Sequence, residues 1–318
     1  MSIISPPILS VVIPAYNVER YIGECIRSVI NQPLFINAVK LFVIIDGATD
    51  STLAAAEEAV ADFREIVTII VQDNAGLSVA RNVGLAQTKT QYVTFLDGDD
   101  YWKDNYLELV VPVLLEESPD IVEYDATLAY EDSSKTCSLK ISKAETGYTT
   151  LAGCNDLLDS FRCYAWARIY RTHIVRNHPY PPNRRFEDIA TTPWYYWQSK
   201  KTISIGHGLI FYRQRSGSIL RSPCVKDIVD ISLTTSEAAA MYLLTNSTYW
   251  QRVAHRSYQQ ACRRITFLPF SMWPELVRKA KGSIDRVPPP SGLMRWLQSR
   301  SPLVYVGLLF FKRHIFRS

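Results

Sequence analysis

Four short apolar runs separated by helical segments fill residues 8–102, and this alternation constrains the fold more than any other feature of the chain. The runs cover 8–14, 39–45, 66–71 and 92–96. Apolar residues at helical spacing lie between them, over 19–31, after Asp50 or Ser51, and over about 77–87. Strands that alternate with helices form a parallel sheet with right-handed crossovers. We therefore predict an α/β fold with a Rossmann-like, mostly parallel sheet and flanking helices.

A polar residue follows each predicted strand: Tyr16, Asp46, Asn74 and Asp97. These side chains should converge, because loops after parallel strands lie at one edge of the sheet, where open α/β sheets bind ligands. The last one begins an Asp-Gly-Asp-Asp turn at 97–100. Its three carboxylates repel one another unless a cation lies among them. An isolated turn of this kind is more often simply solvated, but its place after three other strand ends favours a ligand site.

Two common phosphate-binding motifs are missing from the sequence. No G-x-G-x-x-G follows the first predicted strand, and no G-x-x-x-x-G-K-[ST] occurs. A Rossmann dehydrogenase or a P-loop protein is therefore disfavoured. A bound anion must be held by other means, such as a metal on the aspartates, Arg81 or helix N-termini.

The composition is that of a globular protein, with 47% hydrophobic and 21% charged residues. No apolar stretch is long enough to predict a transmembrane helix. The first residues contain neither a basic segment nor a long apolar one, so we expect no signal peptide. The six cysteines are scattered without C-x-x-C spacing, which predicts reduced, mostly buried thiols in the cytosol.

Charge is distributed unevenly along the chain. Residues 1–224 hold 21 Lys and Arg against 26 Asp and Glu, whereas residues 225–318 hold 14 against 5. The second region has helical spacing, a Pro-rich linker signal at 288–292 and an apolar run at 303–311 that is too short to span a bilayer. This run suits either an interfacial helix on an anionic membrane or a helix docked on the catalytic domain. We predict domains at 1–224 and 225–318.

Four motifs occur in order in the first hundred residues: V-I-P-A-Y-N at 12–17, D-G-A-T-D at 46–50, N-x-G-x-x-x-A-R-N-x-G at 74–84 and D-G-D-D at 97–100. This set resembles family 2 glycosyltransferases with the GT-A fold, of the bacterial surface-polysaccharide type. W-A-R-I-Y-R at 166–171 resembles the acceptor-side segment of that family, and F-E-D at 186–188 its E-D base motif. Ile45 and Ala48 depart from the pattern, which often has Asp or Asn and Ser at these places.

The resemblance implies a nucleotide-sugar donor, most often a UDP-sugar, bound by residues 1–102. The residue chemistry agrees, because Tyr16 offers an aromatic face to a base and Asp46 can accept the imide N–H of uracil. Asp99 would bind Mn²⁺ or Mg²⁺ directly, with Asp97 on the metal or the ribose, since carboxylate oxygens suit both hard ions. The predicted donor-binding residues are Pro14, Tyr16, Asp46, Asn74, Arg81, Asp97, Gly98, Arg215 and Ser218.

The acceptor chemistry is expected from residues 103–224. An inverting transfer needs one base to take the proton of the acceptor hydroxyl. We predict that Asp188 is this base and that Glu187 orients the site; carboxylates in a first helical turn also stabilise the helix dipole, so capping is the alternative. Asp156 and Asp159 are weaker candidates, for which a helix cap and a solvated face are preferred.

The Arg-rich loop at 212–218 follows a predicted strand at 203–211 that is interrupted by two glycines. It is expected either to cover the diphosphate or to be a plain exposed turn. Many family members carry a His in this loop as an extra metal contact. Gln214 and Arg215 stand here instead, so we predict no metal ligand from the loop, and His207 just upstream is interpreted as structural.

The sequence thus predicts a metal-dependent, inverting glycosyltransferase. It would move a hexose or N-acetylhexosamine from a nucleotide sugar to a hydroxyl of a glycan acceptor, in particular a lipid-linked oligosaccharide, at the cytoplasmic face of the plasma membrane. No nucleic-acid partner is predicted. A sugar nucleotidyltransferase would carry a Gly-rich loop after the first strand, and a phosphatase would place its aspartate strand first. A degenerate glycosyltransferase that serves as an assembly partner is disfavoured by the intact set Asp46, Arg81, Asp97, Asp99 and Asp188.

Overall fold

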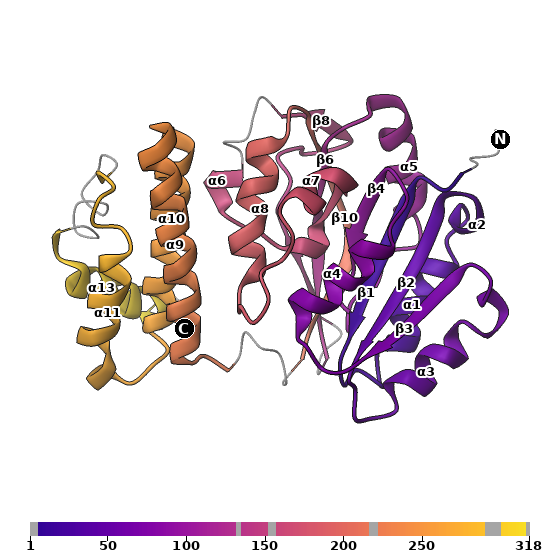
Figure 1. The fold of residues 1–318 in the computed structure, drawn as a ribbon, viewed down its shortest axis with the longest axis horizontal. Coiled ribbons are helices and arrows are strands. Elements are labelled where there is room, and N and C mark those ends of the chain that lie inside the picture. Colours follow the sequence, from indigo (N-terminus) through magenta and orange to yellow (C-terminus); the bar gives the residue numbers. More distant parts are fainter. Residues whose placement is uncertain (1–5, 132–134, 152–156, 216–221, 290–299, 316–318) are drawn as a thin grey trace. The chain divides into compact units, whose positions relative to one another are not determined.

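The structure is a computed structural model that describes every residue except 1–5, 132–134, 152–156, 216–221, 290–299 and 316–318 (Figure 1). The chain forms two compact units that interleave in sequence. The sheet unit comprises residues 1–156, 162–183 and 194–215, and the helical unit comprises residues 157–161, 184–193 and 216–318. The domain boundary predicted at residue 224 stays a prediction.

The described residues of the sheet unit form one ten-stranded sheet with the order β3-β2-β1-β4-β9-β6-β10-β5, in which β7 also pairs with β6 and β8 with β10. The strands are β1 Leu9–Ala15, β2 Val39–Asp46, β3 Val67–Gln72, β4 Tyr92–Phe95, β5 Tyr101–Trp102, β6 Ile121–Tyr130, β7 Thr136–Leu139, β8 Tyr148–Thr150, β9 Arg168–Arg171 and β10 Thr202–Gln214.

The first four strands are parallel, as the alternation of apolar runs and helical segments predicts. β1 is central, with Val12 opposite Phe42 of β2 and Phe95 of β4. The carboxyl ends of these strands therefore lie along one edge of the sheet. β9 runs antiparallel between β4 and β6, which makes the sheet mixed in its second half. β10 is continuous through the two glycines that were predicted to interrupt it, and only its register with β6 shifts on either side of Gly208.

Helices pack on this sheet, as two of them illustrate. In α1 Ile22–Ile30, the buried positions Ile22, Ile26 and Val29 recur at helical spacing. In α4 Leu77–Gln87, a side chain at Gly84 would meet Val12 of β1, so glycine allows the helix to approach closely. The remaining helical segments are α2 Phe35–Ala38, α3 Thr52–Ala59, η1 Ala61–Phe63, α5 Tyr106–Glu117, η3 Ala165–Ala167 and α7 Thr172–Asn177.

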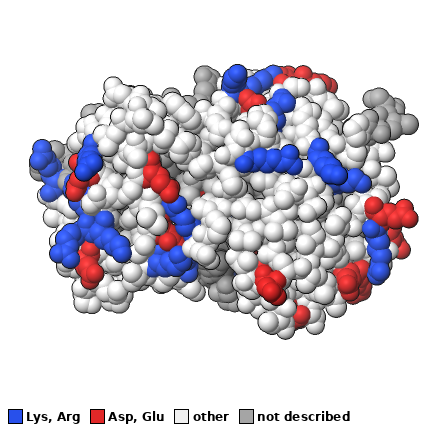
Figure 2. Space-filling view, in the orientation of Figure 1, with Lys and Arg blue, Asp and Glu red and all other residues white. Residues whose placement is uncertain are grey.

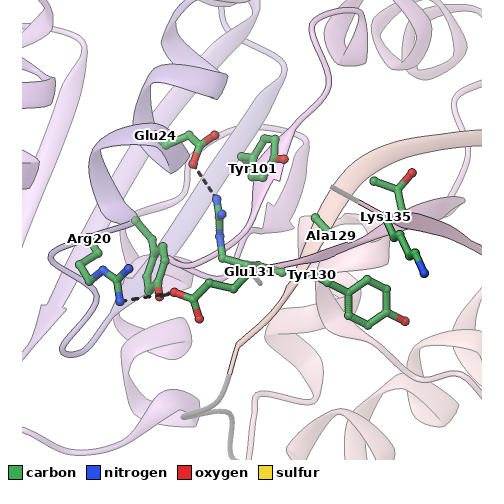
Figure 3. A pocket seen from close by; sticks show the side chains of 10 residues that line it. Arg20, Glu24, Tyr101, Ala129, Tyr130, Glu131 and Lys135 are labelled. Carbon is green, nitrogen blue, oxygen red and sulfur yellow. Dashed lines mark hydrogen bonds and ion pairs between the residues drawn. The ribbon is translucent and has the colours of Figure 1, made fainter. Parts of the chain in front are cut away.

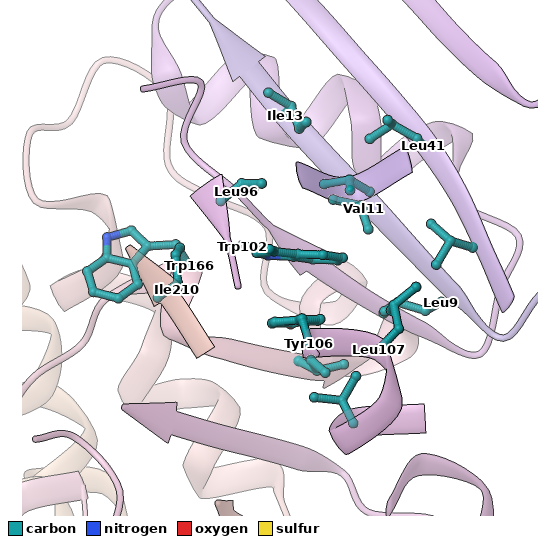
Figure 4. Packing of buried hydrophobic residues seen from close by; sticks show 14 of the residues in the cluster. Leu9, Val11, Ile13, Leu41, Leu96, Trp102, Tyr106, Leu107, Trp166 and Ile210 are labelled. Carbon is teal, nitrogen blue, oxygen red and sulfur yellow. The ribbon is translucent and has the colours of Figure 1, made fainter. Parts of the chain in front are cut away.

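The main hydrophobic core belongs to the sheet unit. Aliphatic side chains of β1 and β2 pack with Leu96, Trp102 and Tyr106 (Figure 4). The rings of Trp102 and Tyr106 are stacked with centroids 3.6 Å apart. Leu96 and Trp102 flank the acidic turn in sequence and are both buried. The turn is thereby anchored at its two ends.

The helical unit contains α6 Leu157–Ser160, α9 Val225–Thr245, α10 Thr248–Ile265, η5 Phe270–Met272, α11 Trp273–Gly282 and α13 Pro302–Ile315. α9 ends at Asn246 in the left-handed conformation, and the Ser247 side chain caps α10. The apolar run 303–311 lies in α13, which packs against α10 and α11 of this unit. No helix in the described part of the chain is long and apolar enough to cross a membrane. α8 Glu187–Gln198 begins in the helical unit and ends in the sheet unit.

Candidate functional site

The candidate site lies at the carboxyl ends of β1, β2 and β4 in the sheet unit. Asp46 ends β2 and is almost fully buried. Its Oδ1 accepts hydrogen bonds from Gln72 Nε2 (2.7 Å) and the Ala75 amide (2.8 Å), and its Oδ2 accepts one from the Gly76 amide (2.9 Å). An ionised carboxylate has about four acceptor positions. Asp46 therefore organises the loop that leads into α4, and it keeps capacity for about one further donor.

Gly47 brings the loop after β2 against the loop after β3. Its φ is +64°, and a Cβ at this position would lie 2.4 Å from the backbone nitrogen of Asn74. Only glycine fits both the conformation and the space. Asn17 ties the loop after β1 to the same region, because its Oδ1 accepts a hydrogen bond from the Thr49 amide at 2.8 Å. The exposed side chains Tyr16 and Asn74 are thus carried by loops that contact the β2 end.

Arg81 of α4 is buried in the sheet unit and bonds Asp97. Its Nη2 lies 2.8 Å from Asp97 Oδ1. The guanidinium lies over the rings of Phe95 and Tyr180, at 5.9 and 5.2 Å from their centroids. Asn82 holds Tyr180 in place through two hydrogen bonds to its backbone. With a residue exposure of 2%, Arg81 is no surface charge; it neutralises and orients Asp97.

The turn 97–100 lies against the end of β1. A side chain at Gly98 would meet the Pro14 carbonyl oxygen at 3.1 Å. The Cys25 thiol donates to the Asp97 carbonyl at 3.6 Å, and burial together with the neighbouring aspartates raises the pKa of this thiol well above its usual value. Pro14 and Gly98, two predicted site residues, are therefore neighbours.

Asp99 and Asp100 occupy electrostatically costly positions. Burial and the charge of Asp97 raise the pKa of the Asp99 carboxyl. Burial and the charges of Asp99 and Asp97 raise the pKa of the Asp100 carboxyl well above its usual value. Asp100 Oδ1 accepts the Arg213 amide at 2.8 Å, while Oδ2 has no hydrogen-bond partner among the described residues. Additional positive charge beside this turn would be stabilising.

Arg213 and Arg215 supply part of that charge. Phe211 of β10 pairs with Tyr101 of β5 in antiparallel register, so Arg213 lies opposite Asp99. Arg213 Nε donates to the Asp99 carbonyl oxygen at 2.9 Å. Arg215 Nε lies 2.6 Å from Asp99 Oδ2. The end of β10 therefore holds both the backbone and the carboxylate of Asp99.

A polar cavity of about 370 Å³ adjoins this contact (Figure 3). Figure 3 shows Arg20 directed toward Glu131, with Glu24 and Tyr101 on a neighbouring wall. Arg213 Nη2 lies 2.6 Å from the Glu24 carboxylate. The cavity is lined by Arg20, Tyr21, Glu24, Tyr101, Ala129, Tyr130, Glu131, Lys135, Thr136 and Arg213.

An aromatic cluster lies close to the acidic turn. The rings of Tyr164 and Trp166 stack 4.8 Å apart, and Tyr212 lies 4.7 Å from Trp166. Burial raises the pKa of the Tyr212 hydroxyl, and the charges of Asp100 and its neighbours raise it further. Tyr212 directly precedes Arg213, whose amide bonds Asp100 of the acidic turn. Trp166 comes from the segment interpreted as acceptor-side and Tyr212 from the predicted Arg-rich loop, whereas no prediction was made from the sequence for Tyr164.

Glu187 and Asp188 begin α8 and belong to the helical unit. Glu187 is buried, whereas Asp188 is half-buried and its Oδ1 accepts the Ile189 amide at 2.8 Å. Their predicted catalytic roles stay predictions. Asp159 pairs with Arg252 at 3.1 Å. His207 is exposed. Ser218 and Asp156 lie outside the described residues.

Asp97 and Asp99 fit a divalent cation by their chemistry. The described residues contain no group of three His, Cys, Asp or Glu side chains placed to hold a metal. Mg²⁺, however, is usually bound through one or two carboxylates together with substrate phosphates rather than by an all-protein cage. Burial and the charge of Asp97 raise the pKa of Asp99, so a further cation beside this carboxylate would be stabilising. Asp99 together with Asp97 therefore suits a metal that arrives with a diphosphate.

Several residues of the site were not among the predicted site residues: Gln72, Asn17, Tyr180, Arg213 and Tyr21. Asn17 lies within the first of the four motifs, but no role was predicted for it. Gln72 ends β3 and could have been noticed as one more polar strand end. Arg213 lay in the predicted Arg-rich loop, but its target depends on the pairing of β10 with β5. The neighbouring sequence of Tyr180 and Tyr21 does not indicate their roles, because each contacts an arginine that is distant in the chain.

The sheet and its loops have the architecture of known GT-A proteins. The structure of S. aureus TarS in complex with UDP-GlcNAc aligns with a TM-score of 0.73 at 17% identity, covering 96% of this chain and 91% of that one. The mannosyltransferase PcManGT from Pyrobaculum calidifontis, in complex with GDP-Man and Mn²⁺, aligns with a TM-score of 0.58 at 12% identity, covering 98% and 88%. The fold is therefore GT-A, as predicted.

Sequence comparison identifies the family. The model of Glycosyl transferase family 2 matches residues 10–178, more than half of the chain. The chain belongs to this family. The glycosyltransferase GlyA of Streptococcus pneumoniae is 28% identical over 224 residues, which are 67% of this chain and 31% of GlyA. The match therefore spans about a third of the length of that relative.

Proposed function

We propose that the protein is a glycosyltransferase that takes a sugar from a nucleotide sugar, in the first instance a UDP-sugar, and transfers it to a hydroxyl of a glycan acceptor. One observation carries the proposal. Asp46 fixes the loop that begins α4, and Arg81 of α4 fixes Asp97. The residues of the donor motifs thus form one connected set at a sheet edge suited to ligand binding. The relatives named as glycosyltransferases support it further.

The division of labour follows from the residues. Tyr16 is half exposed and can stack on the base, and Asp46 keeps about one acceptor position for a base N–H. Asp99 and Asp97 would hold Mn²⁺ or Mg²⁺, in line with the Mn²⁺ complex of PcManGT. Such an ion, when bound, neutralises charge on the departing diphosphate. Arg81 holds the Asp97 carboxylate in place through the ion pair at 2.8 Å.

Asp188 is proposed as the base that takes the acceptor hydroxyl proton while that oxygen attacks the anomeric carbon in line, which inverts the configuration. Glu187 is proposed to orient the site. A lipid-linked glycan at the cytoplasmic membrane face is the proposed acceptor, because the basic residues gather after residue 224.

The test is donor hydrolysis and transfer with a panel of nucleotide sugars, with and without chelator. We expect one UDP-sugar to be turned over, with Mn²⁺ or Mg²⁺ required. Asp99→Asn should abolish turnover and Mn²⁺-dependent UDP binding while leaving the unfolding transition in place. Full turnover in chelator would refute metal dependence, and no turnover of any donor would refute the proposed activity.

A further inference from the structure

Asp99 already has a cation as its partner. Arg215 follows β10 directly, and its Nε lies 2.6 Å from Asp99 Oδ2, with only 23% and 22% of the two side chains exposed. A charge-assisted hydrogen bond at this distance is among the stronger polar interactions in proteins. The oxygen that accepts it belongs to the carboxylate proposed above as the direct metal ligand.

Arg215 also contacts the aromatic ring of Tyr21. The Tyr21 ring faces three guanidinium groups, those of Arg215, Arg213 and Arg20, at 5.6, 5.0 and 5.5 Å. Arg213 also lies 5.0 Å from the Tyr101 ring. These cation–π contacts help to hold Arg213 and Arg215 beside the acidic turn.

A second carboxylate, that of Glu131, contacts Tyr21 and Arg20. The Tyr21 hydroxyl donates to Glu131 Oε1 at 2.5 Å, and Arg20 Nη1 lies 3.4 Å from that oxygen (Figure 3). Tyr21 therefore contacts the Arg215 guanidinium through its ring and Glu131 through its hydroxyl.

A guanidinium and a metal ion compete for Asp99. Two cations on one carboxylate repel each other, and a metal bound through Oδ2 of Asp99 would compete with the guanidinium for the lone pairs of that oxygen. We propose that Arg215 is the resident counter-ion of Asp99 and that it is displaced when a divalent cation binds there together with a diphosphate.

This proposal rests on the proposed function and adds a coupling to it. A metal that arrives alone must break the ion pair without giving the guanidinium a new partner. A metal that arrives with a nucleotide diphosphate supplies anionic oxygens that the displaced guanidinium can bind. Metal and nucleotide should therefore strengthen each other's binding, and by the same factor in both directions.

The test is Mn²⁺ binding measured by electron paramagnetic resonance, with and without UDP. Arg215→Gln removes the charge and keeps a hydrogen-bonding group. We expect it to bind Mn²⁺ alone about tenfold more tightly than wild type, the effect of losing one charge-assisted competitor. The extra affinity that UDP gives to Mn²⁺ should shrink by a similar factor. The double variant Asp99→Asn/Arg215→Gln should lose the roughly tenfold gain in Mn²⁺ affinity.

Arg20→Gln is the matched control, because Arg20 lies on the same Tyr21 ring but pairs with Glu131 and, among the described residues, forms no ion pair with Asp99. It should bind Mn²⁺ as wild type does. Unchanged or weaker Mn²⁺ binding by Arg215→Gln, or an equal gain in Arg20→Gln, would overturn the proposal. Donor turnover by the wild-type protein is measured separately. A failure of the proposed glycosyltransferase activity can therefore be distinguished from a failure of the proposed role of Arg215.

Discussion

At the scale of single residues, the strand-end carboxylates have partners within the protein as well as the ligands proposed for them. Asp46 accepts three hydrogen bonds from the β3–α4 region, and Asp97 is held by Arg81. Substituting these carboxylates would disturb loop structure and ligand contacts together. Glycines that allow the loops to approach one another offer a cleaner test of the loop geometry.

Gly47→Ala is expected to destabilise the protein and weaken UDP binding. A left-handed alanine costs about 1–2 kcal/mol. The new Cβ would also lie 2.4 Å from the Asn74 backbone, which adds about 1–3 kcal/mol of overpacking. Urea unfolding and UDP titration measure the two effects.

Gly147→Ala is the matched control for this substitution. Gly147 has φ +61°, close to that of Gly47, but nothing lies within 4 Å of its Cβ position. Its free energy of unfolding should fall only by the cost of a left-handed alanine, and its affinity for UDP should equal that of the wild type. Equal unfolding free energies for the two variants would show that the contact with the Asn74 loop does not constrain the site.

Asp188→Asn tests the proposed base. Loss of a general base lowers kcat by roughly a hundredfold to ten-thousandfold and leaves donor affinity nearly unchanged. Steady-state kinetics with a saturating acceptor, combined with UDP binding, separates the two quantities. A larger kcat loss in Glu187→Gln would reverse the assignment within the pair.

At the scale of elements, the sequence predicts those strands and helices whose apolar residues recur with a regular local spacing. Apolar runs and turn residues predict β1 to β4 and α4 within a residue or two, and hence the edge that carries Asp46 and Asp97. The insertion of β9 between β4 and β6 was not predicted, because such pairings join segments far apart in the chain. The contact of Arg213 with Asp99 follows from one of these pairings, between β10 and β5. Part of the site was therefore invisible in the sequence.

A buried charge network links four elements of the sheet unit. Arg168 of β9 and Glu123 of β6 have 1% and 3% of their side chains exposed. Tyr196 of α8 lies between them, accepting from Arg168 Nε at 2.9 Å and donating to Glu123 Oε2, and Ser204 of β10 donates to Glu123 Oε1 at 2.9 Å. Burial of such a pair is costly unless every partner is present.

Arg168→Met is expected to destabilise the protein by about 3–5 kcal/mol, because it leaves the Glu123 charge buried without its cation. Arg168→Met combined with Glu123→Gln should recover part of that loss. Arg171→Met is the control: Arg171 lies on the same strand but its pair with Asp120 is partly exposed, with 22% and 18% of the side chains accessible. It should cost about 1 kcal/mol or less. Equal losses in urea unfolding for Arg168→Met and Arg171→Met would show that burial of the network is not what matters.

At the scale of the whole molecule, charge and chemistry are divided along the chain. The described residues that we propose to bind the donor belong to the sheet unit. Residues 225–318 carry 14 Lys and Arg against 5 Asp and Glu. Figure 2 shows Lys and Arg side chains prominent on the visible face of the helical unit, at left, with some acidic side chains among them. This division is consistent with an anionic surface near the helical unit.

α13 is the element that would contact such a surface. Tyr305 and Val306 are buried within the helical unit, whereas Val304, Leu308 and Phe311 are 55%, 42% and 60% exposed. The three exposed side chains are spaced by four and three residues and thus share one face of the helix. α13 therefore has one face packed on α10 and α11 and one exposed apolar face. The interfacial helix and the helix docked on the catalytic domain, which were the two alternatives from the sequence, stay predictions.

We predict that the protein sediments with anionic vesicles and is released by high salt. Each basic residue near an anionic surface contributes about 1 kcal/mol, which salt screens, and insertion of apolar side chains adds to this. Replacing Val304, Leu308 and Phe311 by Ser should reduce vesicle binding by about tenfold or more. Because Tyr305 and Val306 are kept, the unfolding transition should not move, whereas deletion of α13 would remove buried contacts as well.

Leu243→Ser/Leu244→Ser is the matched control for the loss of exposed apolar surface. These side chains end α9 and are 54% and 79% exposed. Vesicle binding by this variant should equal that of wild type, and donor turnover in solution should be unchanged in both variants. If the triple variant of α13 sediments as wild type does, α13 is not the membrane contact. If both variants lose binding equally, the contact is a general property of exposed apolar residues in the helical unit rather than of the α13 face.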